Sequence, residues 1–291
     1  MVTVRAPATS ANFGSGFDVF GAALDTPADV VRVSRAETTS IEMSGAGSQF
    51  IPEDPTKNTA GAVARALDAP ARIRIDKGVR PASGLGSSAA SAAAAAVALN
   101  ELYDLGFSRD ELIPYAAQGE ALVSGAAHAD NVAPSLLGGF TIATPEGVTQ
   151  VDASIPLVAC LPDIVVSTRT ARRVVPQTAP MSDVVDTVGK AATLAVGMAR
   201  DDPILVGRGM EDAIVTPERA ALIEGYDAVR AAALDAGATG VTVSGAGPAM
   251  LAACHRTERK AIASAMVDAF ADVDVEARAY QTSIGEGARV Y

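Results

Sequence analysis

The segment with the clearest chemical potential is the glycine- and serine-rich turn at residues 81–90 (PASGLGSSAA), which leads into an alanine-rich stretch ending near Tyr103. Glycine interrupts regular structure, serine caps a helix, and alanine extends one. A turn that enters a helix leaves backbone N–H groups unpaired at the positive end of the helix dipole, where phosphate groups bind. The turn is not a Walker loop, because no Gly-Lys-Ser/Thr is present. From these residues alone, an anion site and an ordinary capped helix start are equally compatible.

Two further glycine-rich segments follow expected strands. Residues 243–248 (VSGAGP) have glycines that would let the backbone approach a ligand closely. Residues 6–18 (APATSANFGSGFD) place Asn12 and Asp18 in a tight loop after the first strand, which is also the pattern of an Asx turn. Each of these segments is weak evidence of function when taken alone.

Several single polar residues can be explained by structure alone, without a function. Glu120 reads first as a solvated helix carboxylate, His128 as a packed histidine, and the arginines at 169, 172 and 173 as a basic surface. The chain has only two histidines, which excludes a multi-histidine metal site. A bound metal would therefore need hard oxygen ligands, which indicates Mg²⁺ or a similar ion.

The elements that must position these residues follow from hydrophobic periodicity and turn signals. In the first half we expect strands at 2–6, 29–35, 40–43, 71–75 and 138–144, and turns at 10–16 and 25–27. We expect helices at 58–67, 89–103 and 109–123, the last after the possible cap Ser108. In the second half we expect strands at 157–161, 165–168, 240–244, 249–254 and 273–280, and helices at 181–200, 224–236 and 257–270. Such a pattern is typical of an α+β protein with a split βαβ layer, and we place a domain boundary near residue 155.

Composition narrows the class of protein. The chain has 291 residues, 49% hydrophobic and 20% charged, which is typical of a folded protein with a sizeable core. Its net charge of −11 disfavours nucleic-acid partners. The apolar run at 89–99 is about half the ~20 residues that a membrane span needs. The absence of a signal-peptide pattern and the two isolated cysteines predict a reducing cytoplasm. The aspartate-rich, lysine-poor composition fits either a halophilic surface or a GC-rich genome.

Taken in order, segments 6–18, 81–90 and 243–248 resemble the three motifs of the GHMP kinase superfamily, which includes galactokinases and mevalonate kinases. Within it, residues 119–139 (GEALVSGAAHADNVAPSLLGG) and 166–176 (VSTRTARRVVP) are similar to the homoserine kinases. The resemblance implies an α+β fold of two domains. Residues 1–155 would form a domain like the second domain of ribosomal protein S5, and residues 156–291 a ferredoxin-like domain, with ATP between them.

The resemblance also implies roles for residues at the nucleotide. The ATP phosphates would be wrapped by Pro81, Ala82, Ser83, Gly84, Leu85, Gly86, Ser87, Ser88 and Ala89, with Gly245, Ala246 and Gly247 from the third motif. Mg²⁺ would be held by Glu120 and by Ser88, with Ser87 as the alternative. This donor set agrees with the preference of Mg²⁺ for hard oxygen ligands.

By the same resemblance, the acceptor homoserine presents an ammonium, a carboxylate and a reactive hydroxyl. Asp18 and Asp130 would bind the ammonium, Arg172 and Arg219 the carboxylate, and Asn12 and Asn131 the hydroxyl end, with His128 lining the pocket and Thr168 touching the transferred phosphate. All four lysines lie outside the motifs, which favours direct transfer without a lysine-assisted base. A role for Asp18 as a base is the alternative.

The activity implied is ATP-dependent phosphorylation of the homoserine side-chain hydroxyl, on the route to threonine. Two alternatives remain: a GHMP kinase acting on another small alcohol, and a non-catalytic ligand sensor of the same fold. The resemblance further implies a cytoplasmic homodimer with small-molecule partners only, and with neither nucleic acid nor membrane as a partner.

Overall fold

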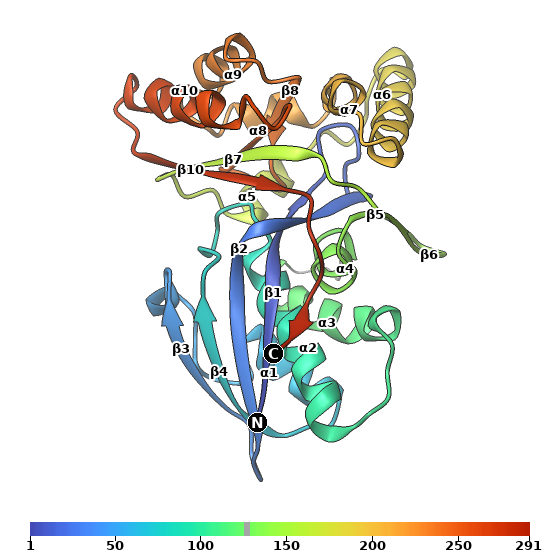
Figure 1. Cartoon of the computed structure of the whole chain (residues 1–291), viewed down its shortest axis with the longest axis vertical. Coiled ribbons are helices and arrows are strands. Elements are labelled where there is room, and N and C mark those ends of the chain that lie inside the picture. Colours follow the sequence, from blue (N-terminus) through green and yellow to red (C-terminus); the bar gives the residue numbers. More distant parts are fainter. Residues whose placement is uncertain (125–128) are drawn as a thin grey trace.

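The computed structural model describes residues 1–124 and 129–291 and places the strands in two sheets, one above the other in Figure 1. The larger sheet has the order β11-β1-β2-β4-β3, with β5 pairing β2 and β6 continuing from β5. Its strands are β1 (Val2–Ala11), β2 (Phe20–Arg35), β3 (Ser40–Gly45), β4 (Ala71–Lys77), β5 (Phe140–Thr144), β6 (Gly147–Val151) and β11 (Arg289–Val290). β4 alternates between buried and exposed residues, as its sequence predicts, and its last inward-facing residue is Lys77.

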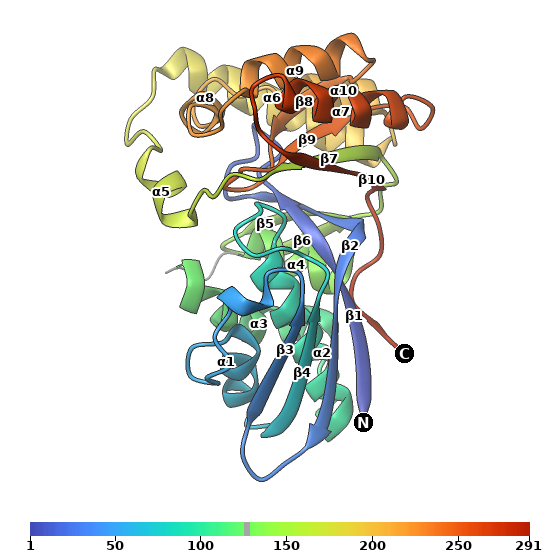
Figure 2. The ribbon, with the colours of Figure 1, turned by 90° about the vertical axis from the view of Figure 1, so that its left-hand side faces the viewer.

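Helices pack against one face of this sheet, as the two views show (Figures 1 and 2). They are α1 (Thr59–Ala66), α2 (Ser87–Tyr103), α3 (Arg109–Ser124) and α4 (Ala129–Leu137), and a short 3₁₀ turn, η1 (Ser48–Phe50), follows β3. Helix α2 lies in the middle, in contact with β1, β2, α1, α3 and α4. Because it is enclosed on nearly every side, only small side chains fit, and this explains its run of alanines.

The second sheet has the order β10-β7-β9-β8 and is antiparallel throughout. Its strands are β7 (Pro156–Pro162), β8 (Gly240–Val243), β9 (Met250–Ala253) and β10 (Ala277–Ser283). The helices of this half are α5 (Thr168–Arg173), α6 (Met181–Ala199), α7 (Pro203–Gly209), α8 (Thr216–Ala220), α9 (Tyr226–Asp235) and α10 (Arg259–Ala271). In chain order the strands lie 4-1-3-2, the arrangement of a ferredoxin-like split βαβ unit, so the predicted fold class is confirmed.

The two halves share a core. Phe13 and Leu24 from the first half pack in one buried cluster with Leu157 and Leu251 from the second sheet. The last strand returns to the first sheet, where Val290 pairs with Val4 of β1. β7 begins directly after the expected boundary at residue 155. The division into 1–155 and 156–291 stays a prediction.

Three local expectations were wrong. Residues 165–168 form no strand; Ser167 caps α5 by accepting from the Thr170 N–H at 3.0 Å, so the cap prevails over the β-propensity of the two valines. Residues 25–27 are no turn but lie within β2, with a cis peptide bond before Pro27. Finally, no serine caps α2, because its N-cap is Gly86 in the left-handed region.

Several elements were not anticipated: η1, β6, α4, α5, α7, α8 and β11. All are short. The predicted cap Ser108 is confirmed, since its hydroxyl and the Glu111 carboxylate form a reciprocal capping box. Within the described residues, no helix has the length and apolar character needed to cross a membrane.

The enclosure of α2 predicts a steep cost for added volume. Ala94 is fully buried, so Ala94→Leu should lower the free energy of unfolding by about 1–3 kcal/mol through overpacking. Urea denaturation measures this quantity. Glu101→Leu, at an exposed position of the same helix, is the matched control and should change it by less than about 0.5 kcal/mol. Equal effects of the two substitutions would contradict the packing argument.

Candidate functional site

The three glycine-rich segments of the sequence meet at the junction of the two halves. The Ser244 hydroxyl donates to the Gly84 carbonyl at 2.7 Å, and the Ala249 N–H donates to the Ser83 carbonyl at 3.1 Å. The Gly245 N–H donates to the Ala11 carbonyl at 3.0 Å. A Cβ atom at Gly84 would lie 2.6 Å from the Ser244 carbonyl oxygen, so glycine is required for this close approach. The loops that were separate motifs in the sequence therefore form one structure.

The start of α2 presents backbone N–H groups for an anion. The N-cap residue is Gly86, with a φ of 63°. Because glycine has no side chain, no side chain at the N-cap accepts from the N–H groups of the first turn. Among the described residues, the N–H groups of Ser87, Ser88 and Ala89 have no hydrogen-bond acceptor. Such groups at the positive end of a 17-residue helix form an anion cradle. The absence of a serine cap thus favours phosphate binding over the ordinary capped helix start.

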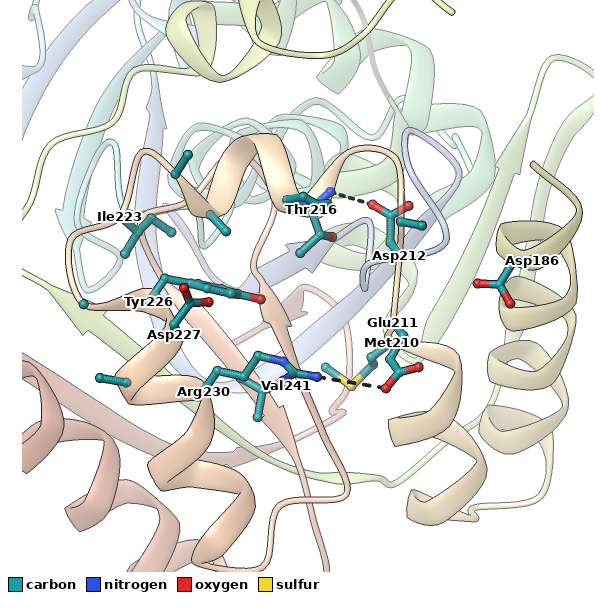
Figure 3. Close-up of a pocket in the computed structure, with 16 residues that line it drawn as sticks. Asp186, Met210, Glu211, Asp212, Thr216, Ile223, Tyr226, Asp227, Arg230 and Val241 are labelled. Carbon is teal, nitrogen blue, oxygen red and sulfur yellow. Dashed lines mark hydrogen bonds and ion pairs between the residues drawn. The ribbon is translucent and has the colours of Figure 1, made fainter. Parts of the chain in front are cut away.

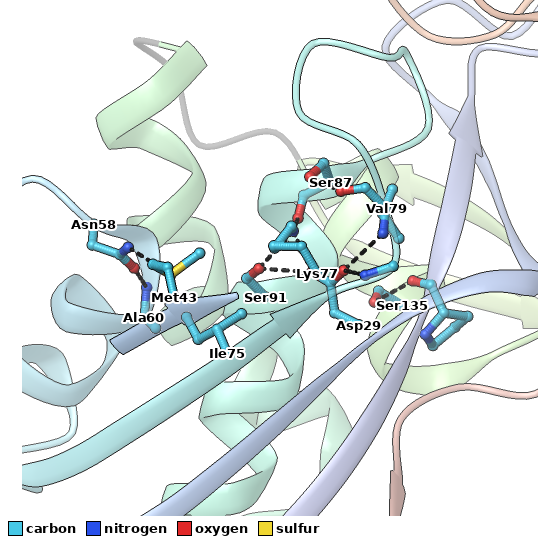
Figure 4. A network of polar contacts seen from close by, with 12 residues as sticks. Asp29, Met43, Asn58, Ala60, Ile75, Lys77, Val79, Ser87, Ser91 and Ser135 are labelled. Carbon is cyan, nitrogen blue, oxygen red and sulfur yellow. Dashed lines mark hydrogen bonds and ion pairs between the residues drawn. The ribbon is translucent and has the colours of Figure 1, made fainter. Parts of the chain in front are cut away.

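A buried ion pair holds this loop in place (Figure 4). Lys77 and Asp29 form a salt bridge with both side chains fully buried. The Lys77 ammonium also donates to the Ser87 carbonyl at 2.7 Å and to the Ser91 hydroxyl at 2.8 Å, and Ser91 donates to Asp29 at 2.7 Å. Burial lowers the pKa of Lys77, and the Asp29 carboxylate counters that effect. The pair therefore connects β2 and β4 to the first turn of α2.

The other oxygen of Asp29 holds the beginning of the loop. It accepts from the N–H groups of Gly78 and Val79 at 3.1 and 3.0 Å. The Ser87 hydroxyl donates to the Val79 carbonyl at 2.7 Å and closes the loop on itself. One carboxylate thus positions both ends of the segment that precedes α2. Sequence reasoning missed this network, although the alternation of β4 places Lys77 inward.

Most predicted site residues line one cavity of ≈ 110 Å³ beside this helix start. They are Asn12, Asp18, Gly84, Gly86, Ser87, Ser88, Glu120, Asp130, Asn131, Thr168, Arg172, Arg219, Gly245 and Ala246. They come from seven segments of the chain and from both halves. Of the three neighbouring arginines, only Arg172 lines the cavity, while Arg169 and Arg173 are exposed.

Charged groups at one end of this cavity are paired. Arg172 donates to both carboxylate oxygens of Asp18, at 2.5 and 3.1 Å. The guanidinium groups of Arg172 and Arg219 lie 5.2 and 4.9 Å from the centre of the Phe17 ring, within cation–π range. Phe17 is a residue of the first motif whose role the sequence did not indicate.

Arg219 is the most constrained of these charges. It is 6% exposed and donates to the Gly245 carbonyl at 2.6 Å. Burial lowers the pKa of Arg219 and the charge of Arg172 lowers it further, while the carboxylates of Asp18, Asp130 and Asp212 raise it. Arg219 therefore joins the third motif to the charged end of the cavity.

The side chains of Asn12 and Asn131 are held by different hydrogen bonds. The Asn12 amide donates to the Gly245 carbonyl and accepts from the Asp18 N–H, both at 3.0 Å, so it joins two loops. The Asn131 carbonyl oxygen accepts from the Thr9 hydroxyl at 2.8 Å. That bond directs the Asn131 NH₂ group, which lies 3.5 Å from the Asp130 carboxylate. Thr9 is thus an orienting residue that sequence reasoning missed.

The remaining predicted residues do not line this cavity. Ser83, Leu85 and Ala89 are buried, and Pro81 lines a neighbouring cavity of ≈ 180 Å³. Ala82 and Gly247 belong to the two loops without lining either cavity. His128 lies outside the described residues.

That neighbouring cavity shares Ser87 and Ser88 with the first. Its other walls are largely apolar, with Met43, Phe50, Ile51, Pro52 and Ile75 joined by Asn58, Thr59 and Lys77. The helix start therefore separates a charged compartment from an apolar one.

A larger cavity of ≈ 780 Å³ lies in the second half beside α8 and α9 (Figure 3). Asp186, Glu211, Asp212, Tyr226 and Arg230 are among its lining residues. Asp212 accepts from three backbone N–H groups at 2.6–3.0 Å and so caps the turn into α8. None of the predicted site residues lines this cavity.

Comparisons with known proteins agree with this arrangement. Residues 56–139 match the GHMP kinases N terminal domain, and residues 194–272 match the GHMP kinases C terminal domain. The fold and the interlocked loops are thus those of a GHMP kinase.

Individual relatives show which GHMP kinases this chain is similar to in sequence and structure. The chain is 75% identical to a homoserine kinase of Natronomonas pharaonis over the full length of both chains. It is 72% identical to a homoserine kinase of Halorubrum lacusprofundi, covering all of this chain and 99% of the relative. The crystal structure of homoserine kinase from Cytophaga hutchinsonii superposes with a TM-score of 0.91 at 35% identity, covering 100% of this chain and 97% of that one. The chain belongs to the homoserine kinase family of the GHMP kinases.

The buried pair at the helix start gives a prediction for stability. Asp29→Asn leaves the Lys77 ammonium buried without its counter-charge and should lower the free energy of unfolding by about 3–5 kcal/mol. The double variant Asp29→Asn/Lys77→Met removes both charges and should recover part of that loss. Urea denaturation of the single and double variants measures the coupling. Purely additive losses would show that the two side chains are not coupled.

Proposed function

We propose that the protein transfers the terminal phosphoryl group of ATP to the side-chain hydroxyl of L-homoserine, giving O-phospho-L-homoserine and ADP. The observation that carries this proposal is the charge balance of the cavity beside the helix start. Two carboxylates, Asp18 and Asp130, face two guanidinium groups, Arg172 and Arg219, at one end of it. Equal numbers of the two charges suit a zwitterion such as an amino acid.

The nucleotide end is supported by the start of α2. The N–H groups of Ser87, Ser88 and Ala89 would bind phosphate oxygens, with Gly84, Gly86 and Gly245 allowing close approach. The apolar compartment on the other side of the serines would take the base of the nucleotide.

A magnesium ion fits the donor set near the phosphates. Ser88 and Glu120 both line the cavity and offer a hydroxyl and a carboxylate oxygen. Ser87 is the weaker candidate, because its hydroxyl already donates to the Val79 carbonyl. When bound, Mg²⁺ would neutralise charge on the phosphates.

The acceptor end requires the pair between Arg172 and Asp18 to open. In the structure these side chains satisfy each other. The ammonium of the substrate would lie at Asp18 and Asp130, and its carboxylate would take the place of Asp18 at Arg172, beside Arg219. Each charge would exchange one partner for another, so binding would leave no group unpaired.

The hydroxyl end is built from neutral groups. Asn131 is oriented by Thr9 and would hold the hydroxyl that forms the new O–P bond, with Thr168 at the transferred phosphate. Asn12, whose amide joins two loops, would act mainly by holding Asp18. Lys77 is paired with Asp29, so it would not assist a base at the substrate hydroxyl. Phosphoryl transfer needs mainly positioning and charge neutralisation, and the hydroxyl proton would leave to water or a phosphate oxygen. Asp18 as a base is the alternative.

The rival functions fit the site less well. Mevalonate has no ammonium, so it would offer no positive charge to the two carboxylates, Asp18 and Asp130, that line the cavity. A sensor without turnover would not require Glu120 and Ser88 beside the phosphate cradle. The expected homodimer and the cytoplasmic location stay predictions.

A coupled assay for ADP release tests the proposal directly. We expect turnover with L-homoserine and Mg-ATP, and at least about 100-fold lower kcat/KM with mevalonate, shikimate or galactose, since ~2.8 kcal/mol of charge recognition would be lost. Equal turnover with any of these alcohols would refute the assignment of substrate. No turnover with any of them, despite tight homoserine binding, would favour a sensor.

Substitution of Arg172 separates recognition of the acceptor from recognition of ATP. Arg172→Ala should lower kcat/KM for homoserine at least about tenfold, because losing a hydrogen bond to a charged group costs ~1.5–3 kcal/mol and this side chain is 41% exposed. The KM for ATP should change little. Arg169→Ala is the matched control, since that side chain is exposed and does not line the cavity. Similar behaviour of the two variants would mean that the arginines form only a basic surface.

Substitution of Glu120 tests the metal. Glu120→Gln should fold but require more Mg²⁺ for half-maximal activity and should turn over more slowly, because a neutral amide binds the ion less strongly than a carboxylate. The measurement is kcat as a function of Mg²⁺ concentration at saturating substrates. An unchanged profile would remove Glu120 from the metal site.

A further inference from the structure

The cavity of ≈ 780 Å³ beside α8 and α9, which we call the α8–α9 cavity, has the size and the lining of a ligand site (Figure 3). Its volume lies within the range of about 300–1,000 Å³ that is typical of small-molecule sites. Met210, Ile223 and Val241 give it apolar walls, and the aromatic ring of Tyr226 lies among them. Apolar walls with a few polar groups between them are the usual composition of such a site.

The Tyr226 side chain is buried, yet its hydroxyl has no hydrogen-bond partner among the described residues. Tyr226 is 8% exposed. Figure 3 shows its ring extending into the cavity between Thr216 and Arg230, with the oxygen at the tip. A buried tyrosine hydroxyl normally forms a hydrogen bond. Burial raises the pKa of Tyr226, so the phenol stays neutral at pH 7 and its oxygen can accept a hydrogen bond. This hydroxyl is therefore placed to bind a ligand in the cavity.

The charges around the cavity select the sign of that ligand. Its described lining residues include four carboxylates and one guanidinium. Asp212 is held by backbone N–H groups, and Glu211 is engaged by Lys190 at 2.7 Å. Asp186 of α6 and Asp227 of α9 are exposed and have no ion pair among the described residues. Figure 3 shows these two on opposite sides of the cavity. The cavity thus attracts positive charge at both sides.

We propose that the α8–α9 cavity binds a linear aliphatic diamine, with one ammonium group at Asp186 and the other at Asp227. Tyr226 precedes Asp227 in the chain and lies beside it in Figure 3, so one ammonium can reach both side chains. That ammonium donates to the Tyr226 hydroxyl as well as to the carboxylate. The methylene chain between the two charges lies against the apolar walls, which removes apolar surface from water.

Other occupants fit the cavity less well. A nucleotide or a phosphate would be repelled by the four carboxylates. An amino acid would need a cation for its carboxylate, but Arg230 lies 4.0 Å from the Glu211 carboxylate and is shared with it. A single inorganic cation would bind at one side and leave the apolar walls in contact with water. A diamine matches both the separated charges and the apolar surface between them.

Helix α8 separates this cavity from the charged end of the proposed acceptor site. Thr216, Pro217 and Ala220 line the α8–α9 cavity, whereas Arg219 of the same helix lines the other cavity. The inference therefore does not depend on which alcohol the enzyme phosphorylates. It does require a control for binding of an amine at Asp18, the carboxylate that we assign to the substrate ammonium.

Titration with defined amines tests the site. Isothermal titration calorimetry of the full chain at fixed ionic strength should show one site per chain for 1,6-diaminohexane or 1,8-diaminooctane, with a Kd of ~1 mM or below. Hexylamine, which lacks one charge, should bind about two- to fivefold more weakly than 1,6-diaminohexane. Hexane-1,6-diol, which lacks both charges, should bind at least about tenfold more weakly. No binding of either diamine, or equal binding of hexylamine or of the diol, would overturn the proposal.

Tyr226→Phe locates the bound diamine. The substitution removes only the hydroxyl and leaves no polar group buried, so the chain should fold. The Kd for the diamine should rise at least about tenfold, because a hydrogen bond to a charged group is lost. Tyr280→Phe is the matched control, since Tyr280 is half-buried on β10 and lines neither cavity, and it should leave the Kd unchanged. A Tyr226→Phe chain that binds as tightly as the parent chain would refute the site.

Substitution of carboxylates separates this cavity from the acceptor site. Asp227→Asn should raise the Kd about two- to fivefold, the effect of removing one exposed charge pair. Asp235→Asn, at an exposed position near the other end of α9, should have no effect. Asp18→Asn should leave the Kd unchanged. Loss of diamine binding in Asp18→Asn, with Asp227→Asn like the parent chain, would place the diamine in the acceptor site and overturn the inference without touching the proposed kinase activity.

Discussion

The buried pair between Asp29 and Lys77 is the interaction on which the nucleotide end of the site depends. Both side chains are fully buried. The Lys77 ammonium donates to the Ser87 carbonyl, and the Asp29 carboxylate accepts from the N–H groups of Gly78 and Val79, so the pair contacts both ends of the loop before α2. A buried ion pair is rarely a large net source of stability, because desolvation offsets attraction. Its value here is geometric. It holds β2, β4 and the first turn of α2 in one arrangement, which fixes the direction of the N–H groups of Ser87 and Ser88, the groups that we propose bind phosphate.

Preorganisation at the acceptor end works through pairing of opposite charges. Arg172 is held by Asp18, and Arg219 by the Gly245 carbonyl and the Phe17 ring. Two guanidinium groups that share one aromatic ring would repel each other in an apolar setting, and the nearby carboxylates offset that repulsion. The site therefore keeps its charges balanced without substrate, and a zwitterion can exchange with the internal pair at little electrostatic cost.

Much of the fold was predictable because local patterns carry it. The alternation of β4, the alanine run of α2 and the three glycine-rich turns are short-range signals, and the confirmed strands and long helices rest on them. Short elements such as α5 were missed, since one capping residue decides them and leaves little periodicity. At the site, the resemblance to known kinase motifs indicated Arg172 and Asn131, but the roles of Phe17, Thr9 and Lys77 depend on contacts between distant segments. Only the inward position of Lys77 on β4 could have drawn attention to it.

The loop at residues 244–247 connects the two regions that we propose bind ATP and homoserine. Its Ser244 hydroxyl holds the Gly84 carbonyl of the phosphate loop, while the Gly245 carbonyl accepts from Asn12 and from Arg219 at the acceptor end. A side chain at position 84 would displace this loop, because a Cβ there would lie 2.6 Å from the Ser244 carbonyl oxygen and 2.8 Å from that of Gly247. Glycine at position 84 is thus required by geometry, because the backbone itself makes the contact between the two loops. A substitution near this loop is therefore tolerated only if the Gly84 and Gly245 carbonyl groups keep their positions.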